Sequence, residues 1–149
     1  MPARLVDVHH GDVLIGTDPE RVGPVAVHGF VSEQSSWAPG RSFEVQARAI
    51  EHGALVAGAD DSDGVQVGFA RMVTDLAAFA WSADVYVAPE VRGRGLGTTI
   101  VWTIVDHPDV GVPRQILATE DDHGLCERFG HRPLDDADHV THRTPSGPT

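Results

Sequence analysis

The chain has 149 residues, 41% of them hydrophobic, and a formal net charge of -11 at pH 7. This length and composition suit one globular domain with one core. The negative charge excludes the broad basic surface of a nucleic-acid binder, so an anionic ligand must be held by local groups. Every basic residue is arginine. The absence of lysine excludes Schiff-base catalysis and the lysine of an ATP-binding P-loop.

The sequence favours a cytoplasmic protein that is not embedded in a membrane. No apolar run approaches the roughly 18 residues that a membrane-spanning helix needs. The first residues include His9, His10 and Asp12, whereas a secretory leader would be apolar there. Cys126 is the only cysteine, so we expect no disulfide within the chain and no cysteine-based zinc site. The scattered histidines also predict no metal site.

The first half of the chain predicts one strand followed by two helices. Residues 13–16 form a short apolar run that predicts the strand. Asp18 and the proline after it are typical of a helix start, and apolar residues at spacings of three and four continue over residues 22–30. Glycines and a proline in that stretch predict a helix that is kinked or starts late. Ser42 predicts the N-cap of a second helix, which runs to about His52.

The second half predicts a hairpin, a third antiparallel strand and a longer helix. Residues 54–59 and 65–73 flank a turn rich in Asp and Gly, which predicts the hairpin. Residues 79–87 are rich in aromatic and β-branched side chains, as strands are. Apolar residues at spacings of four and five from Leu96 predict a helix that Pro108 ends.

The remaining segments complete one domain. Residues 115–118 predict another strand, residues 124–129 a short helix and residues 132–134 a last strand. Residues 144–149 predict a disordered tail, which leaves residues 1–143 as a single domain. This order predicts an α+β fold in which one mixed, mostly antiparallel sheet is flanked by helices.

The segment Arg92-Gly93-Arg94-Gly95-Leu96-Gly97 joins a predicted strand directly to the longer helix. The first N–H groups of a helix have no partner within it, so they favour a bound phosphate. The glycines let phosphate oxygens approach those groups, and the two arginines add charge-assisted hydrogen bonds. The spacing lacks the final gap of the dinucleotide fingerprint, and no Gly-Lys-Ser/Thr is present. Neither a dinucleotide nor ATP is therefore favoured.

Around this segment the chain resembles the GCN5-related N-acetyltransferase (GNAT) family, whose signature Gln/Arg-x-x-Gly-x-Gly/Ala is matched by residues 92–97. The preceding Val-x-Pro-Glu and the segment at 125–130 also follow the family's order, so the resemblance covers about residues 13–134. It implies the acyl-CoA N-acyltransferase (GNAT) fold, with acetyl-CoA as co-substrate and the thioester where the fourth and fifth strands separate. Homodimers are common in the family, and the sequence leaves a homodimer open. The residues implied to bind acetyl-CoA are Val85, Tyr86, Val87, Arg92, Gly93, Arg94, Gly95, Leu96, Gly97 and Thr98.

Four residues are candidates for the proton transfers that acetyl transfer to an amine needs. Asp84 precedes Tyr86 by two on the predicted strand, so both side chains share a face, and it is the candidate base. Alternatively, Asp84 caps a neighbouring loop or helix. Cys126 stands where the resembled family commonly has tyrosine and is the candidate acid, unless it is only a small buried apolar residue. His123 and Tyr86 are alternatives to it.

Trp37 and Arg41 lie between the two early helices, in a segment that borders the acceptor pocket of the resembled family. They are candidates for clamping a planar or anionic acceptor, although packing alone would also explain Trp37. We therefore expect an N-acetyltransferase that moves an acetyl group from acetyl-CoA to a primary amine of a small molecule or peptide, by direct transfer and without a metal. The alternative is a non-catalytic acyl-CoA binding or sensing module, because the family's tyrosine is missing.

Overall fold

The computed structural model describes residues 3–34, 38–117, 130–132 and 141. Its strands are β1 (Asp7–His10), β2 (Val13–Gly16), β3 (Leu55–Asp60), β4 (Gln66–Thr74), β5 (Phe79–Val87) and β6 (Arg114–Leu117). Its helices are α1 (Pro24–Gly29), α2 (Phe43–His52) and α3 (Leu96–Val105), with the short helical turns η1 (Pro19–Arg21), η2 (Phe30–Gln34) and η3 (Pro89–Val91).

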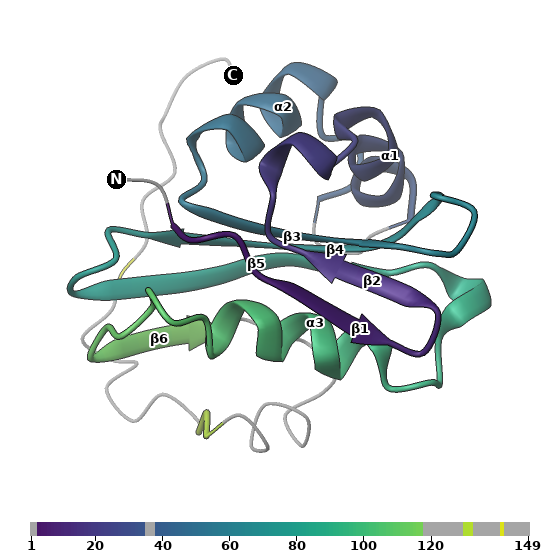
Figure 1. Ribbon diagram of the computed structural model, residues 1–149. Coiled ribbons are helices and arrows are strands. Elements are labelled where there is room, and N and C mark those ends of the chain that lie inside the picture. Colours follow the sequence, from purple (N-terminus) through teal and green to yellow (C-terminus); the bar gives the residue numbers. More distant parts are fainter. Residues whose placement is uncertain (1–2, 35–37, 118–129, 133–140, 142–149) are drawn as a thin grey trace, which may run out of the picture.

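The six strands form one sheet in the order β1-β2-β3-β4-β5-β6. Neighbouring strands are antiparallel except β5 and β6, which are parallel. The helices α1 and α2 cover one face of the sheet, and α3 covers the other (Figure 1). This arrangement confirms the predicted α+β fold with a mixed, mostly antiparallel sheet flanked by helices.

The early helices follow the predicted caps and breaks. Ser42 accepts a hydrogen bond from the Val45 N–H at 3.2 Å, and α2 runs to His52 as predicted. The helix α1 begins only at Pro24, after η1, and passes at Phe30 into the π turn η2. The late start confirms the prediction made from the glycines and the proline.

The structure adds β1, which the sequence did not predict. Its residues alternate between exposed and half-buried, and only Val8 among them is apolar. An edge strand of this composition has almost no hydrophobic signal. The later predicted strands correspond to β3, β4, β5 and β6 within one residue. The predicted helix at 124–129 and the tail at 144–149 lie outside the described residues. Arg132, in the predicted last strand, is described and is not in a strand.

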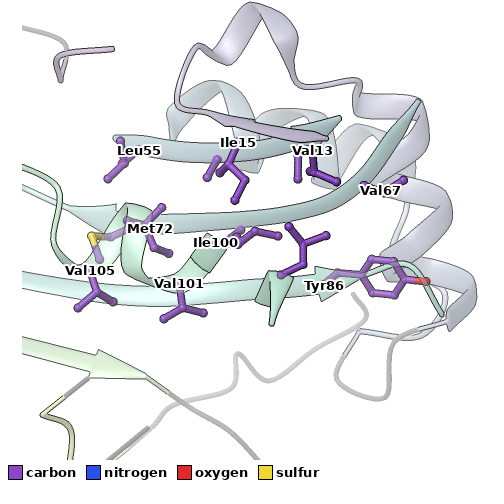
Figure 2. Packing of buried hydrophobic residues seen from close by; sticks show 14 of the residues in the cluster. Val13, Ile15, Leu55, Val67, Met72, Tyr86, Ile100, Val101 and Val105 are labelled. Atoms are coloured by element: carbon purple, nitrogen blue, oxygen red, sulfur yellow. The ribbon is translucent and has the colours of Figure 1, made fainter. Parts of the chain in front are cut away.

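Two clusters of buried apolar side chains lie on either side of the sheet. The cluster on the α3 side joins strand residues to Ile100 and Ile104, which are fully buried. Figure 2 shows Ile100 of α3 on the same side of the strands as Ile15 and Met72. The cluster on the α1 side consists of Val22, Val27, Val31, Val56 and Phe69.

The sheet carries a glycine where α3 approaches it most closely. A Cβ atom on Gly68 would lie 2.6 Å from Cδ1 of Ile100 and 3.2 Å from Cβ of Ala59. No side chain fits at 2.6 Å unless Ile100 shifts. Gly68 therefore sets the distance between β4 and α3.

β5 carries a bulge near its C-terminal end. Tyr86 pairs with Phe69 and Ala83 pairs with Arg71, so two residues of β5 oppose one residue of β4. One of the two, Asp84, has a φ of 54°, in the left-handed region that side chains other than glycine rarely adopt.

Among the described residues, β5 pairs with β6 as far as the residue two before Asp84. The last pair is Ser82 with Leu117. Over residues 83–87, β5 pairs only with β4 within the described part of the chain.

We predict that Gly68→Ala lowers the free energy of unfolding by about 1–3 kcal/mol, because the added methyl group overpacks the contact with α3. Ile100→Val removes the clashing Cδ1 and is expected to cost about 0.5–1.5 kcal/mol alone. Urea unfolding of both single variants and the double variant measures their coupling. The double variant should be more stable than the summed costs imply. Strict additivity would contradict the close contact.

Candidate functional site

The loop after β5 presents the backbone of the first turn of α3. Gly95 is the N-cap residue at φ 77° and offers no side-chain hydrogen bond. Gly93 is also left-handed, at φ 82°. The Thr99 N–H donates to the Gly95 carbonyl at 3.2 Å, which is the first backbone bond of the helix. The N–H groups of residues 96–98 therefore have no acceptor within the helix and can donate to an anion.

Arg92 ties this loop to the end of β5. Its Nε donates to the Val87 carbonyl at 2.8 Å, and its guanidinium lies 5.6 Å from the centre of the Tyr86 ring. The Tyr86 ring stacks on Phe30 at 4.5 Å. Burial raises the pKa of the Tyr86 hydroxyl, and the positive charge of Arg92 opposes part of that rise. The structure thus brings together the two segments predicted to bind acetyl-CoA, residues 85–87 and 92–98.

His10 of β1 holds the same loop from the other side. Its Nε2 lies 2.7 Å from the Arg94 carbonyl, and its Nδ1 lies 3.0 Å from Oγ1 of Thr99. A carbonyl only accepts, so Nε2 carries a proton. This role of His10 could not be predicted from the sequence, because it depends on the unpredicted strand β1.

A second cluster of polar side chains lies at the β5 bulge. Oδ2 of Asp84 accepts from Nε of Arg71 at 2.6 Å and from Nη1 of Arg41 at 2.7 Å. Arg41 also donates from Nη1 to Oε1 of Gln46 in α2 at 2.9 Å. The Asp84 side chain is only 2% exposed. This cluster lies on the face of the sheet that α1 and α2 cover, because Gln46 belongs to α2.

The environment of Asp84 favours its charged form. Burial alone would raise the pKa of this carboxyl, but the hydrogen bonds and positive charges of Arg71 and Arg41 outweigh burial and hold the pKa below its ordinary value. Its role as the general base stays a prediction. The observed contacts favour the other role considered for it, which is a structural one.

Asp84 reaches Arg41 of the segment before α2. Tyr86 stacks on Phe30 of η2, and both pack with the apolar cluster that includes Ile100 of α3. That Asp84 and Tyr86 share one face of β5 stays a prediction. Arg71 was not among the predicted site residues. Nothing in the sequence near Arg71 signals that it faces Asp84, since the pairing depends on the register of β4 and β5.

Three predicted site residues, Trp37, His123 and Cys126, lie outside the described residues, and their roles stay predictions. Within the described ranges, no group of three or more His, Cys, Asp or Glu side chains is placed to hold a metal ion. No helix in that part of the chain is both long and apolar enough to cross a membrane.

Comparison with known proteins decides the family. Residues 27–131 match the sequence profile of the Acetyltransferase (GNAT) family. The chain belongs to the GNAT acetyltransferase family. The match confirms the resemblance carried by residues 92–97, and the GNAT fold accounts for the mixed sheet with a helix after the glycine-rich loop.

Solved GNAT structures agree with this membership. A Xanthomonas campestris protein assigned to the GNAT acetyltransferases is 35% identical and superposes with a TM-score of 0.84, over 93% of this chain and 95% of that chain. An Escherichia coli GNAT family N-acetyltransferase in complex with CoA shares the fold at 22% identity and a TM-score of 0.64, over 88% of this chain and 75% of that chain.

A curated relative matches over a shorter stretch. A Gibberella zeae protein, named an acetyltransferase by inference, is 28% identical over 104 residues, or 58% of this chain. The match covers 59% of the fungal protein, so this GNAT chain aligns with little more than half of that relative.

We predict that His10→Ala weakens CoA binding by the GNAT loop about fivefold, because the loop loses hydrogen bonds worth about 1 kcal/mol. Isothermal titration with CoA measures the affinity. His9→Ala is the matched control, since His9 is the exposed neighbour on the same strand. Equal affinities in the two variants would contradict a role for His10 in holding the loop.

We predict that Asp84→Asn lowers the free energy of unfolding at pH 7 by about 3 kcal/mol, because it leaves two guanidinium groups without a counter-charge. The pKa of Asp84 is lowered in the folded chain, so its stabilisation is complete above about pH 4 and is lost as the pH falls through the folded pKa. The difference in unfolding free energy between the wild type and Asp84→Asn should therefore shrink as the pH falls through the folded pKa of Asp84.

Urea unfolding from pH 7 down to pH 2 tests this pH dependence. Asp12→Asn, at an exposed turn, is the control and should change stability by less than about 0.5 kcal/mol. A difference for Asp84→Asn that stays constant down to pH 2 would show that the carboxylate charge is not what stabilises the cluster.

Proposed function

We propose that the chain transfers an acetyl group from acetyl-CoA to a primary amine of a small molecule or peptide. One observation carries the proposal: the first turn of α3, whose N–H groups at residues 96–98 have no acceptor within the helix, follows the loop that Arg92 ties to the end of β5. The Escherichia coli GNAT structure that shares this fold contains CoA, which supports the choice of donor.

In this proposal the donor lies along β5 and ends at α3. The N–H groups of residues 96–98, with Arg92 and Arg94, bind the pyrophosphate. The amides of the pantetheine arm pair with the backbone of residues 85–87, as an added strand would. The thioester then lies beside the bulge, where β5 and β6 separate.

The chemistry is direct attack of the amine on the thioester carbonyl. The C–N bond forms, the C–S bond breaks, and the CoA thiolate leaves with the electron pair and takes up a proton.

The reaction also needs groups that remove the amine proton and protonate the CoA thiolate. Two arginines hold Asp84 as an anion with a lowered pKa, which makes it a weak base, so we expect water to carry away the proton of the amine. Cys126 and His123 stay the candidates for protonating the thiolate.

Binding of the donor is tested with thermal unfolding. Acetyl-CoA should raise the melting temperature well beyond ATP or NAD at equal concentration. Arg94→Glu should weaken acetyl-CoA binding about tenfold, because it replaces a charge-assisted hydrogen bond by repulsion. Arg48→Glu, on an exposed position of α2, is the matched control and should bind normally. Equal effects of the two substitutions would argue against this site.

Turnover is tested by release of the CoA thiol with a panel of amines. Thiol release that depends on the amine, with one acetylated product, supports the transferase. Tight binding of acetyl-CoA with no turnover over a broad panel would instead support an acyl-CoA binding or sensing module.

A further inference from the structure

The cluster at the β5 bulge carries a surplus of positive charge. One carboxylate, Asp84, serves two guanidinium groups, and no other acidic side chain pairs with Arg41 or Arg71 among the described residues. The side chains of Arg41 and Arg71 are only 20% and 15% exposed. Water therefore compensates their charge less than it would on the surface, and a cation held without a counter-ion is costly.

The hydrogen-bonding groups left over on Arg41 and Arg71 are all donors. Nη1 of Arg41 is used by Asp84 and Gln46, whereas its Nε and Nη2 make no bond within the described chain. Within the described residues Arg71 donates only from Nε, which leaves both of its Nη groups. Arginine has no acceptor, so its complement must accept several hydrogen bonds.

Gln46 provides an independent observation of the same kind. Its side chain is fully buried, and its Nε2 has no hydrogen-bond partner. The orientation of the amide is fixed, because Arg41 can only donate and so Oε1 must face it. A buried donor without an acceptor is rare in folded proteins. Gln46 is thus another side chain of the cluster that has a donor without an acceptor.

The position of the cluster relates it to the reaction proposed above. Asp84 lies in the bulge, two residues beyond Ser82, the last residue of β5 that pairs with β6. Arg71 comes from the neighbouring strand, and Arg41 from the segment that enters α2. The donors therefore lie beside the bulge of β5, on the face opposite α3.

We infer that Arg41 and Arg71 form a subsite for an anionic group of the acceptor, so that the acceptor is an amine that also carries a carboxylate or a phosphate. This inference rests on the proposed function for the reaction itself. The anionic oxygens accept from the unused N–H groups of both arginines. Asp84 is then a positioning residue, which holds the two guanidinium groups side by side and prevents their repulsion from driving them apart.

Matched pairs of acceptors test the substrate class. β-Alanine is compared with β-alaninamide, and O-phosphoethanolamine with ethanolamine, at equal concentrations of unprotonated amine. For at least one pair, kcat/KM of the wild type should be about tenfold or more higher for the anionic member. Equal use of both members of every pair that turns over would overturn the inference.

Arg41→Gln is the decisive variant, because it leaves Asp84 paired with Arg71 and so keeps the buried carboxylate neutralised. It should lose the preference for the anionic member, so that the ratio of kcat/KM for the two members of a pair approaches one. Arg48→Gln is the control and should keep the preference. Thermal unfolding confirms that both variants are folded. A stability loss in Arg41→Gln with an unchanged preference would show a purely structural role.

A binding measurement separates this inference from the transferase proposal. Inorganic phosphate is titrated in the Arg94→Glu background, which weakens phosphate binding at the α3 loop. Phosphate should raise the melting temperature of this variant and should do so much less when Arg41→Gln is added. If no amine is acetylated, the transferase proposal fails while this titration still decides the subsite. Equal stabilisation with and without Arg41 would overturn it.

Discussion

The buried carboxylate of Asp84 is the constraint on which the rest of the site depends. It occupies a left-handed backbone conformation that costs of order 1–2 kcal/mol for a residue with a side chain. Charge-assisted bonds from Arg71 and Arg41 offset that cost. Because Asp84 is held in this way, β5 keeps its bulge, and its pairing with β4 shifts register there.

The bulge therefore joins the two halves of the site. Downstream of it, β5 leads through η3 to the loop and the first turn of α3, which are the groups suited to a pyrophosphate. On the face covered by α1 and α2, the same residue fixes Arg41 and Arg71, which are suited to an anion. One short segment of β5 thus sets the distance between the groups suited to acetyl-CoA and those suited to the acceptor molecule. Because Gly68 has no side chain, α3 can pack closely against the neighbouring strand β4.

Local chemistry made much of the fold predictable from the sequence. The cap at Ser42, the Asp-rich turn before β4 and the apolar spacing in α3 each act within a few residues, and each prediction was confirmed. The glycine-rich loop was predictable for the same reason, since strand, glycines and helix follow one another in the chain. The family match over residues 27–131 confirmed the resemblance that this loop carried.

Features that depend on register were not predictable. The edge strand β1 has too few apolar residues to signal a strand, so the contact of His10 with the loop was missed. An aspartate with positive φ has no sequence signal as clear as glycine, and the bulge was therefore missed as well. The pairing of Arg71 with Asp84 follows from that bulge. Arg41 was predicted near an acceptor, although its partner was not. Trp37, His123 and Cys126 remain untested.

The contact of His10 with the loop at residues 92–97 fixes the backbone path of the loop without involving the charge of its arginine side chains. The imidazole lies within hydrogen-bonding distance of the carbonyl of Arg94 and the hydroxyl of Thr99, so it holds the loop through the backbone of residue 94. Any residue at position 94 offers the same carbonyl. Over evolutionary time, the charge displayed at this position can drift to suit different acyl carriers or salt conditions while the backbone path around the phosphate stays as it is.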